Sequence, residues 1–329
     1  MTGEAEAWAR RIDPEIRAVL DLVPRLDLTD IPTARRERAE LAARAAAGYV
    51  APATVRTQER RIPGWPEGEP DVVVRVHEPA LPATSRAPAV LWVHGGGHVL
   101  GTAAQDDPLL QDLVARTGCV AVAVEWRRAP EHPYPAAVHD AYAALRWMAA
   151  DPALDRERLV VGGASSGGGA AAGLALLARD RAEVALAGQI LVYPMLDDRE
   201  VTASSREVLD PRLWNHESNR LGWAAYLSGL DGEDVPAYAA PARSADVGGL
   251  PPTWIATGEL DLFRDEDVEY ASRLFAAGVP TELHVYPGAV HGFDLFAADA
   301  RVSRRYRRDR DEAFDRFVGI APSASAEAG

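Results

Sequence analysis

The chain has 329 residues, 47% of them hydrophobic and 26% charged, which is ordinary for a globular protein of one large α/β domain with insertions or of two smaller domains. Its formal net charge of -14 at pH 7 disfavours general affinity for nucleic acid or for anionic membranes. The single cysteine, Cys119, excludes an internal disulfide and favours a reducing, cytoplasmic compartment.

The N-terminal stretch shows helical patterns and no strand pattern. Charged residues occur throughout residues 1–20, which argues against a secretory signal, and no apolar stretch in the chain is long enough to span a bilayer. Asp13-Pro14-Glu15 is a typical helix start, and a second helix is expected over residues 33–47. We therefore expect residues 1–50 to form a helical cap segment ahead of the main fold.

Strand and helix patterns alternate from residue 54 onward. Residues 54–62 and 71–78 predict an antiparallel pair of strands. Further strands are expected at 88–93, 120–124, 159–162, 189–193, 252–258 and 281–286, with helices at 108–116 and 135–149, a helix ending at 277, and one at 305–317. This alternation predicts an α/β fold whose parallel sheet is covered by helices on both faces.

Three segments depart from the alternation. Residues 125–135 form a proline-rich loop, which we interpret as a structural brace beside the site. Residues 196–245 have helical character and predict an inserted cap, so the core would comprise residues 51–195 and 246–320. The small, polar tail at 321–329 is expected to be disordered.

The stretch Gly163-Ala164-Ser165-Ser166-Gly167 lies between an apolar strand and an alanine-rich helix. A serine between two glycines at such a turn is typical of a nucleophile elbow, because only small residues fit beside the strained serine. A glycine-rich turn without chemistry is the alternative. A phosphate loop is disfavoured because the chain has no lysine, and the spacing of the glycines does not fit a dinucleotide site.

A second signal is His94-Gly95-Gly96-Gly97, directly after the predicted central strand. The amides of this glycine run, together with that of Ser166, can converge on an oxyanion. A flexible loop is the alternative interpretation. We expect His94 to order the loop rather than to carry a proton.

An acid and a base complete the pattern, because Asp261 and His291 each follow a predicted strand. At the carboxyl edge of a parallel sheet they would meet Ser165, with His291 as the base and Asp261 orienting it. Glu259 and Asp265 are nearby alternatives for the acid. Asp197-Asp198 could suggest a metal pair, but no ligand spacing accompanies it, so a solvated or capping role is expected and no metal. We expect Cys119, in its apolar strand, to be a core residue.

At this point the chain resembles the bacterial hormone-sensitive-lipase-like carboxylesterases of the α/β-hydrolase superfamily. The resemblance covers nearly the whole chain, and its motifs are His94-Gly95-Gly96-Gly97, residues 128–135, the elbow at Ser165, Tyr193-Pro194, residues 261–266 and His291-Gly292-Phe293. It implies an eight-stranded, mostly parallel sheet, a helical cap, an oxyanion hole formed by the amides of Gly96, Gly97 and Ser166, and no cofactor. Ala164, Ser166 and His98 depart from the family pattern.

Together these features predict a serine carboxylesterase that hydrolyses short-to-medium acyl esters, with a small-molecule ester as its partner. His98, Trp214 and Trp223 are candidates for the substrate pocket. The same site could serve an amidase or a dehydratase, and a non-catalytic small-molecule receptor is the alternative from another class. The sequence leaves the oligomeric state open, a homodimer included.

Overall fold

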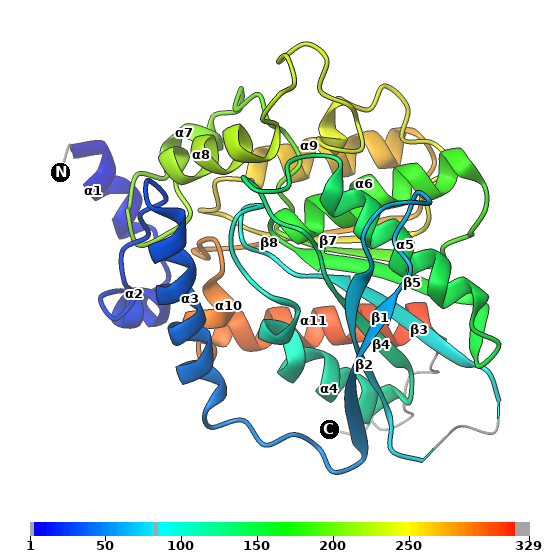
Figure 1. Ribbon diagram of the computed structural model, residues 1–329. Coiled ribbons are helices and arrows are strands. Elements are labelled where there is room, and N and C mark those ends of the chain that lie inside the picture. The colour runs from blue at the N-terminus through cyan, green and yellow to red at the C-terminus, as the bar shows by residue number, and fades with distance from the viewer. Residues whose placement is uncertain (1–2, 82–84, 320–329) are drawn as a thin grey trace.

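The computed structural model describes residues 3–81 and 85–319, and one eight-stranded sheet organises them (Figure 1). The strands are β1 (Val55–Ile62), β2 (Val72–Pro79), β3 (Ala87–Val93), β4 (Val120–Glu125), β5 (Leu154–Ala164), β6 (Gly188–Val192), β7 (Thr253–Gly258) and β8 (Thr281–Tyr286). Their order is β1-β2-β4-β3-β5-β6-β7-β8. The β1–β2 and β2–β4 pairs are antiparallel and the others are parallel. The predicted mostly parallel, eight-stranded sheet is therefore confirmed.

Helices cover both faces of this sheet, as the alternating pattern predicts. The helices α4 (Asp107–Thr117) and α11 (Arg301–Val318) contact each other on one face. The helices α5 (Ala136–Ala150) and α6 (Ser166–Arg181) contact each other on the opposite face, where α9 (Arg264–Ala276) packs on β7 and β8 (Figure 1). Short elements complete the core: η1 (Ala103–Asp106), η2 (Pro241–Arg243) and α10 (Phe293–Phe296).

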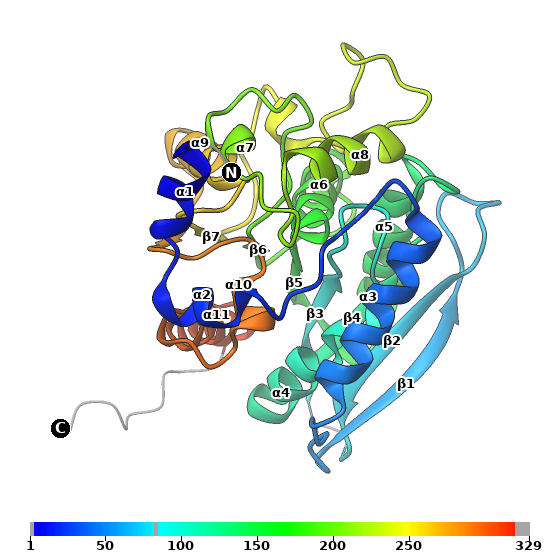
Figure 2. The same ribbon diagram turned by 90° about the vertical axis from the view of Figure 1, so that its left-hand side faces the viewer.

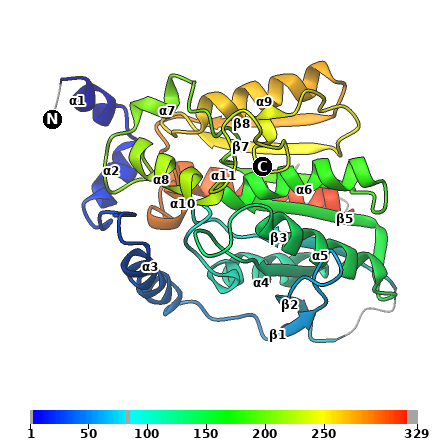
Figure 3. The ribbon, with the colours of Figure 1, turned by 45° about the horizontal axis from the view of Figure 1, so that its top comes forward.

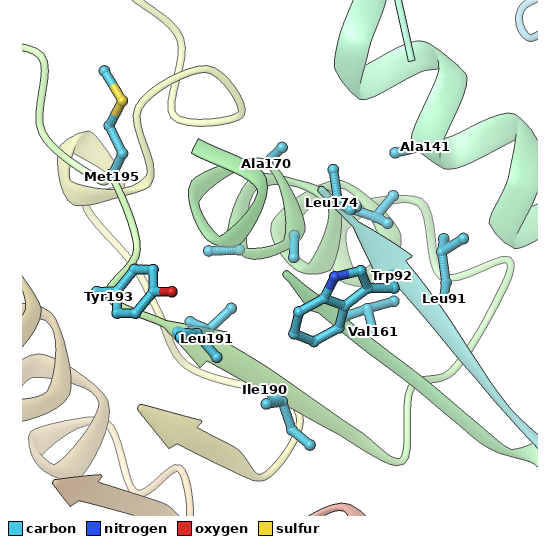
Figure 4. Close-up of a cluster of buried hydrophobic side chains, with 14 of the residues drawn as sticks. Leu91, Trp92, Ala141, Val161, Ala170, Leu174, Ile190, Leu191, Tyr193 and Met195 are labelled. Carbon is cyan, nitrogen blue, oxygen red and sulfur yellow. The ribbon is translucent and has the colours of Figure 1, made fainter. Parts of the chain in front are cut away.

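The strands β3, β4, β6 and β7 and the second half of β5 are mostly apolar, as expected of strands whose two faces are buried. Figure 4 shows Leu91 and Val161, which pair in register on β3 and β5, close to Leu174 of α6. On the other face the ring of Trp92 lies 6.0 Å from that of Phe314 in α11. This two-sided packing fixes the strand ends, and hence the loops that follow them.

The N-terminal helices and the segment after β6 lie at the same end of the molecule (Figures 2 and 3). The elements concerned are α1 (Gly3–Arg10), α2 (Pro14–Leu20), α3 (Ile31–Ala46), α7 (Ser204–Glu207) and α8 (His216–Tyr226). Among the described residues, two hydrogen-bonded contacts join the N-terminal segment to the segment after β6. The Leu26 amide donates to the Pro211 carbonyl at 2.8 Å, and Arg212 pairs with Asp21 at 2.5 Å. Segments nearly 200 residues apart thus form one connected layer.

The main differences from the expected elements concern their starts. Helix α1 was not expected, β5 begins at Leu154 instead of residue 159, and α11 begins at Arg301 instead of residue 305. Of the extra residues in β5, Arg156 and Glu157 are exposed and Asp155 and Arg158 are half-buried, so their polar sequence concealed the strand. The tail expected to be disordered, 321–329, lies outside the described residues. Over the part of the chain that the structure describes, no helix is long and apolar enough to cross a membrane.

Candidate active site

The turn between β5 and α6 holds Ser165 in an unusual backbone conformation. Its φ of 57° and ψ of -125° lie outside the regions that most side-chain-bearing residues adopt. A Cβ on Gly163 would lie 2.3 Å from the Gly167 carbonyl oxygen, and a Cβ on Gly167 would lie 2.1 Å from that of Val93. Only glycine fits at these two positions, which is the steric condition that the elbow motif requires.

Ser165, His291 and Asp261 form one hydrogen-bonded chain. The Ser165 Oγ lies 3.0 Å from His291 Nε2, and His291 Nδ1 lies 2.9 Å from Asp261 Oδ2 and 3.1 Å from Oδ1. Asp261 is 1% exposed and Ser165 is 8% exposed. Because an ionised carboxylate only accepts hydrogen bonds, Nδ1 must donate, which leaves Nε2 free to accept the serine proton.

Aromatic rings hold the imidazole of His291 from two sides. The Tyr193 ring lies 4.6 Å from it and the Phe263 ring lies 5.1 Å from it, both edge-on. The Tyr193 hydroxyl donates to Asp294 at 2.9 Å, which anchors that ring. Phe263 also donates its amide to Asp261 Oδ1 at 3.0 Å. The base and its acid are therefore restrained together.

The other two acids at this strand end have different partners. Glu259 binds Arg11 at 2.8 Å and accepts the Gly288 amide at 2.9 Å. These two contacts, the Arg11 contact first, lower the pKa of Glu259. Asp265 accepts the Ser204 amide at 2.9 Å. Of these three acids, only Asp261 lies within hydrogen-bond distance of His291.

The glycine loop after β3 lies beside the elbow with free amides. Gly96 has a φ of 137° and Gly97 a φ of 58°, which side-chain-bearing residues rarely adopt. Neither amide donates a hydrogen bond in the described structure. The Ser166 amide belongs to the first turn of α6, where N–H groups have no partner within the helix. All three predicted donors are thus available at the positive end of the α6 dipole.

His94 is buried beneath this loop. Its Nδ1 donates to the Gly95 carbonyl at 2.9 Å, and its ring stacks on Trp126 at 4.8 Å. Burial lowers its pKa to about 3, so the imidazole is neutral. These contacts suit a residue that orders the loop.

The three residues predicted to line the pocket occupy different surroundings. The Trp214 ring covers Gly97 so closely that a Cβ there would lie 1.8 Å from it. His98 is 1% exposed and stacks on Tyr226 at 3.8 Å, with Trp223 at 5.2 Å. Burial lowers the pKa of His98 to about 3. Trp214 therefore lies against the glycine loop, whereas His98 and Trp223 pack in an aromatic cluster. The role of all three residues in substrate binding stays a prediction.

The predicted carboxylate pair after β6 binds arginines. Asp197 is buried and pairs with Arg199 at 2.7 Å, and Asp198 pairs with Arg243 at 2.6 Å. No group of three metal-binding side chains occurs in residues 3–81 and 85–319. Cys119 is buried, and this burial raises its pKa to about 11, as suits a core thiol.

Glu266 is a buried acid close to the site whose burial the sequence did not predict. It lies in the first turn of α9, where it accepts the amides of Leu196 and Asp197 at 2.6 and 3.2 Å. Burial raises its pKa well above the usual value. It fixes the chain after β6, and no local sequence signal indicates so distant a partner.

This arrangement can perform acyl transfer. It supplies a hydroxyl whose proton a neutral imidazole can accept, a carboxylate that stabilises the resulting imidazolium, and amides that can stabilise an oxyanion.

Comparison with known proteins gives consistent matches. A family model described as alpha/beta hydrolase fold matches residues 90–295. The chain is 37% identical over 292 residues to carboxylesterase NlhH of Mycobacterium tuberculosis, covering 87% of this chain and 90% of that protein. It is 36% identical over 291 residues to esterase LipI of the same organism, covering 87% and 89%. The solved structure named Bacterial Heroin Esterase superposes with a TM-score of 0.90 at 40% identity, covering 94% of this chain and 98% of that one.

Proposed function

The chain belongs to the hormone-sensitive-lipase-like carboxylesterases of the α/β-hydrolase superfamily, and we propose that it hydrolyses short-to-medium acyl esters through an acyl-enzyme on Ser165. The observation that carries the proposal is the chain of hydrogen bonds from Ser165 through His291 to Asp261. Free amides at Gly96, Gly97 and Ser166 support it.

In the proposed reaction His291 Nε2 takes the proton of Ser165 as its Oγ attacks the ester carbonyl. The oxyanion of the tetrahedral intermediate accepts hydrogen bonds from the three amides. The imidazolium, stabilised by Asp261, then gives its proton to the departing alcohol. Water attacks the acyl-enzyme by the same route and releases the acid. No cofactor takes part in this sequence.

Substrate size should follow from Trp214 and the helices above the elbow. Trp214 is buried against the oxyanion loop and donates its indole N–H to Asn219 at 3.1 Å, which limits its movement. A pocket covered by Trp214 and these helices suits small esters better than long-chain triglycerides. We expect the best kcat/KM for acyl chains of roughly four to eight carbons, a range that the family resemblance implies. An acyl-chain series of p-nitrophenyl esters measures this preference, and a preference for long chains would contradict it.

The nucleophile can be tested with a neighbouring serine as a matched control. Ser165→Ala should lower kcat by about 10⁶ while the fold stays intact, as in other serine triads. Ser166→Ala should have a mild effect because its backbone amide remains. If the two variants exchange outcomes, the nucleophile is misassigned.

Labelling separates hydrolysis from mere ligand binding. An organophosphate should modify the wild-type protein stoichiometrically at Ser165, and the Ser165→Ala variant not at all. A protein that binds esters without labelling or turnover would be a receptor on this fold. Matched ester and amide substrates distinguish an esterase from an amidase.

A further inference from the structure

Arg35 links the N-terminal helices to the loop that carries the oxyanion amides. It lies in the second turn of α3, and its Nε donates to the Val99 carbonyl at 2.7 Å. Its Nη2 donates to the Ala129 carbonyl, also at 2.7 Å. One guanidinium therefore bridges the glycine loop and the proline-rich loop.

Glu131 holds the guanidinium in this position. Its carboxylate accepts hydrogen bonds from Nη1 and Nη2 of Arg35, each at 2.8 Å. Arg35 lowers the pKa of Glu131 to about 2, so the pair stays ionised at neutral pH. The Arg35 side chain is 25% exposed and that of Glu131 is 53% exposed. The planar, bidentate geometry is one that a lysine cannot reproduce.

The Val99 carbonyl, which accepts a hydrogen bond from Arg35, belongs to a tight turn that contains Gly96 and Gly97. The amides of Val99 and Leu100 both donate to the Gly96 carbonyl, at 3.1 and 2.8 Å. The Ala129 amide donates to the His98 carbonyl at 3.0 Å, which joins this turn to the proline-rich loop. The Arg35 guanidinium joins the same two loops, because it donates to the carbonyls of Val99 and Ala129.

We propose that Arg35 is a positioning residue that fixes the oxyanion amides of Gly96 and Gly97 through the carbonyls of Val99 and Ala129. The inference rests on the proposed esterase function. Arg35 itself does not contact the reacting atoms. Without the hydrogen bonds from Arg35 the turn should shift, and a displacement of about 1 Å at such donors costs on the order of 10²-fold in rate.

The test compares Arg35→Ala and Arg35→Lys with Arg36→Ala, a control on the same helix. Arg36 donates to the Thr33 hydroxyl of the same helix at 2.7 Å instead of to the glycine loop. With p-nitrophenyl butyrate, kcat should fall by about 10- to 100-fold in Arg35→Ala, with KM changed less than about threefold. Arg35→Lys should recover only part of the loss, and Arg36→Ala should match the wild type.

Two further measurements separate positioning from a merely structural role. Guanidinium ion at millimolar concentration should partly restore kcat of Arg35→Ala, and affinity for a trifluoromethyl ketone, which forms an oxyanion, should fall in proportion to kcat. Glu131→Gln keeps both carbonyl contacts and should lose less activity than Arg35→Ala. If Arg35→Ala does not fold, Arg35→Lys and Glu131→Gln carry the same comparison.

Three results would each overturn the inference, and the third would also refute the proposed function. A lower melting temperature in both Arg35 variants, with kcat within about twofold of the wild type and no guanidinium rescue, would overturn the inference and leave Arg35 as an anchor of α3. A raised KM with unchanged kcat would also overturn it. Wild-type and Arg36→Ala proteins without ester hydrolysis would refute the proposed function, and the inference with it.

Discussion

Replacing Asp261 with asparagine tests the assignment of the acid, and the structure predicts how the replacement acts. Asp261 Oδ1 accepts the Phe263 amide at 3.0 Å, so the oxygen of an asparagine should remain on that side. Its NH₂ group would then replace Oδ2, which lies 2.9 Å from His291 Nδ1. An NH₂ donor at 2.9 Å favours an accepting Nδ1 over the longer contact of 3.1 Å that Nδ1 makes with Oδ1, and an accepting Nδ1 places the ring hydrogen on Nε2.

That tautomer cannot accept the proton of Ser165, although the geometry is preserved. We expect kcat to fall about 10⁴-fold, equivalent to about 5 kcal/mol of transition-state stabilisation. Steady-state hydrolysis of a p-nitrophenyl ester measures the loss, and circular dichroism with a melting curve verifies the fold.

Glu259→Gln is the matched control at the same strand end. Its amide oxygen can still accept the Gly288 amide, and only the ion pair with Arg11, half-exposed, is lost. Its kcat should stay within about threefold of the wild type, since exposed pairs contribute little. A nearly normal Asp261→Asn enzyme beside an inactive Glu259→Gln enzyme would refute the assignment.

Packing around the site gives three further predictions. Gly97→Ala should lower kcat about 10²-fold, since its Cβ would lie 1.8 Å from the Trp214 ring; if adding Trp214→Ala recovers none of the loss in ester hydrolysis, this clash is not the cause. His98→Phe should keep the stack on Tyr226 and make the protein less sensitive to acid. Burial lowers the pKa of His98 from its ordinary value of 6.5 to about 3 in the folded protein, so the contribution of the neutral imidazole to stability is complete above pH 6.5. That contribution is lost as the pH falls, by up to about 1.4 kcal/mol per pH unit. Equal losses for both proteins between pH 7 and 5 in urea unfolding would contradict it. Glu266→Gln should leave the free energy of unfolding within about 1 kcal/mol, because an amide oxygen can still accept the two backbone N–H groups. Glu266→Ala leaves both groups without an acceptor and should cost about 3 kcal/mol, and equal losses in the two variants would contradict this.

The central strands β3, β4, β6 and β7 could be predicted because they are buried on both faces and form nearly continuous apolar runs. β3 and β7 were expected within about one residue of their observed starts for this reason. The first half of β5 was missed because residues 155–157 are polar and largely exposed. Helix α1 was missed because it is only 8 residues long, too short for a clear period.

The proximity of the three candidate site residues could be predicted from the sequence, but many of the contacts that support the site could not. Ser165, Asp261 and His291 each follow a strand, and parallel topology brings such loops together. Arg35, by contrast, reaches carbonyls 64 and 94 residues away, and Glu266 binds amides 70 and 69 residues away. Partners this distant depend on how the layers pack, which residue patterns along the chain do not record.

The strained backbone of Ser165 lowers the stability of the folded protein, whereas the proposed catalysis requires a serine at this position. A side chain held at a φ of 57° and a ψ of -125° costs on the order of 1–3 kcal/mol, whereas glycine adopts such angles without strain. Ser165→Gly should therefore raise the free energy of unfolding while it removes the nucleophile. Directed evolution that selects only for heat resistance would favour this loss, so a thermostability campaign should keep codon 165 invariant or screen every round for ester hydrolysis.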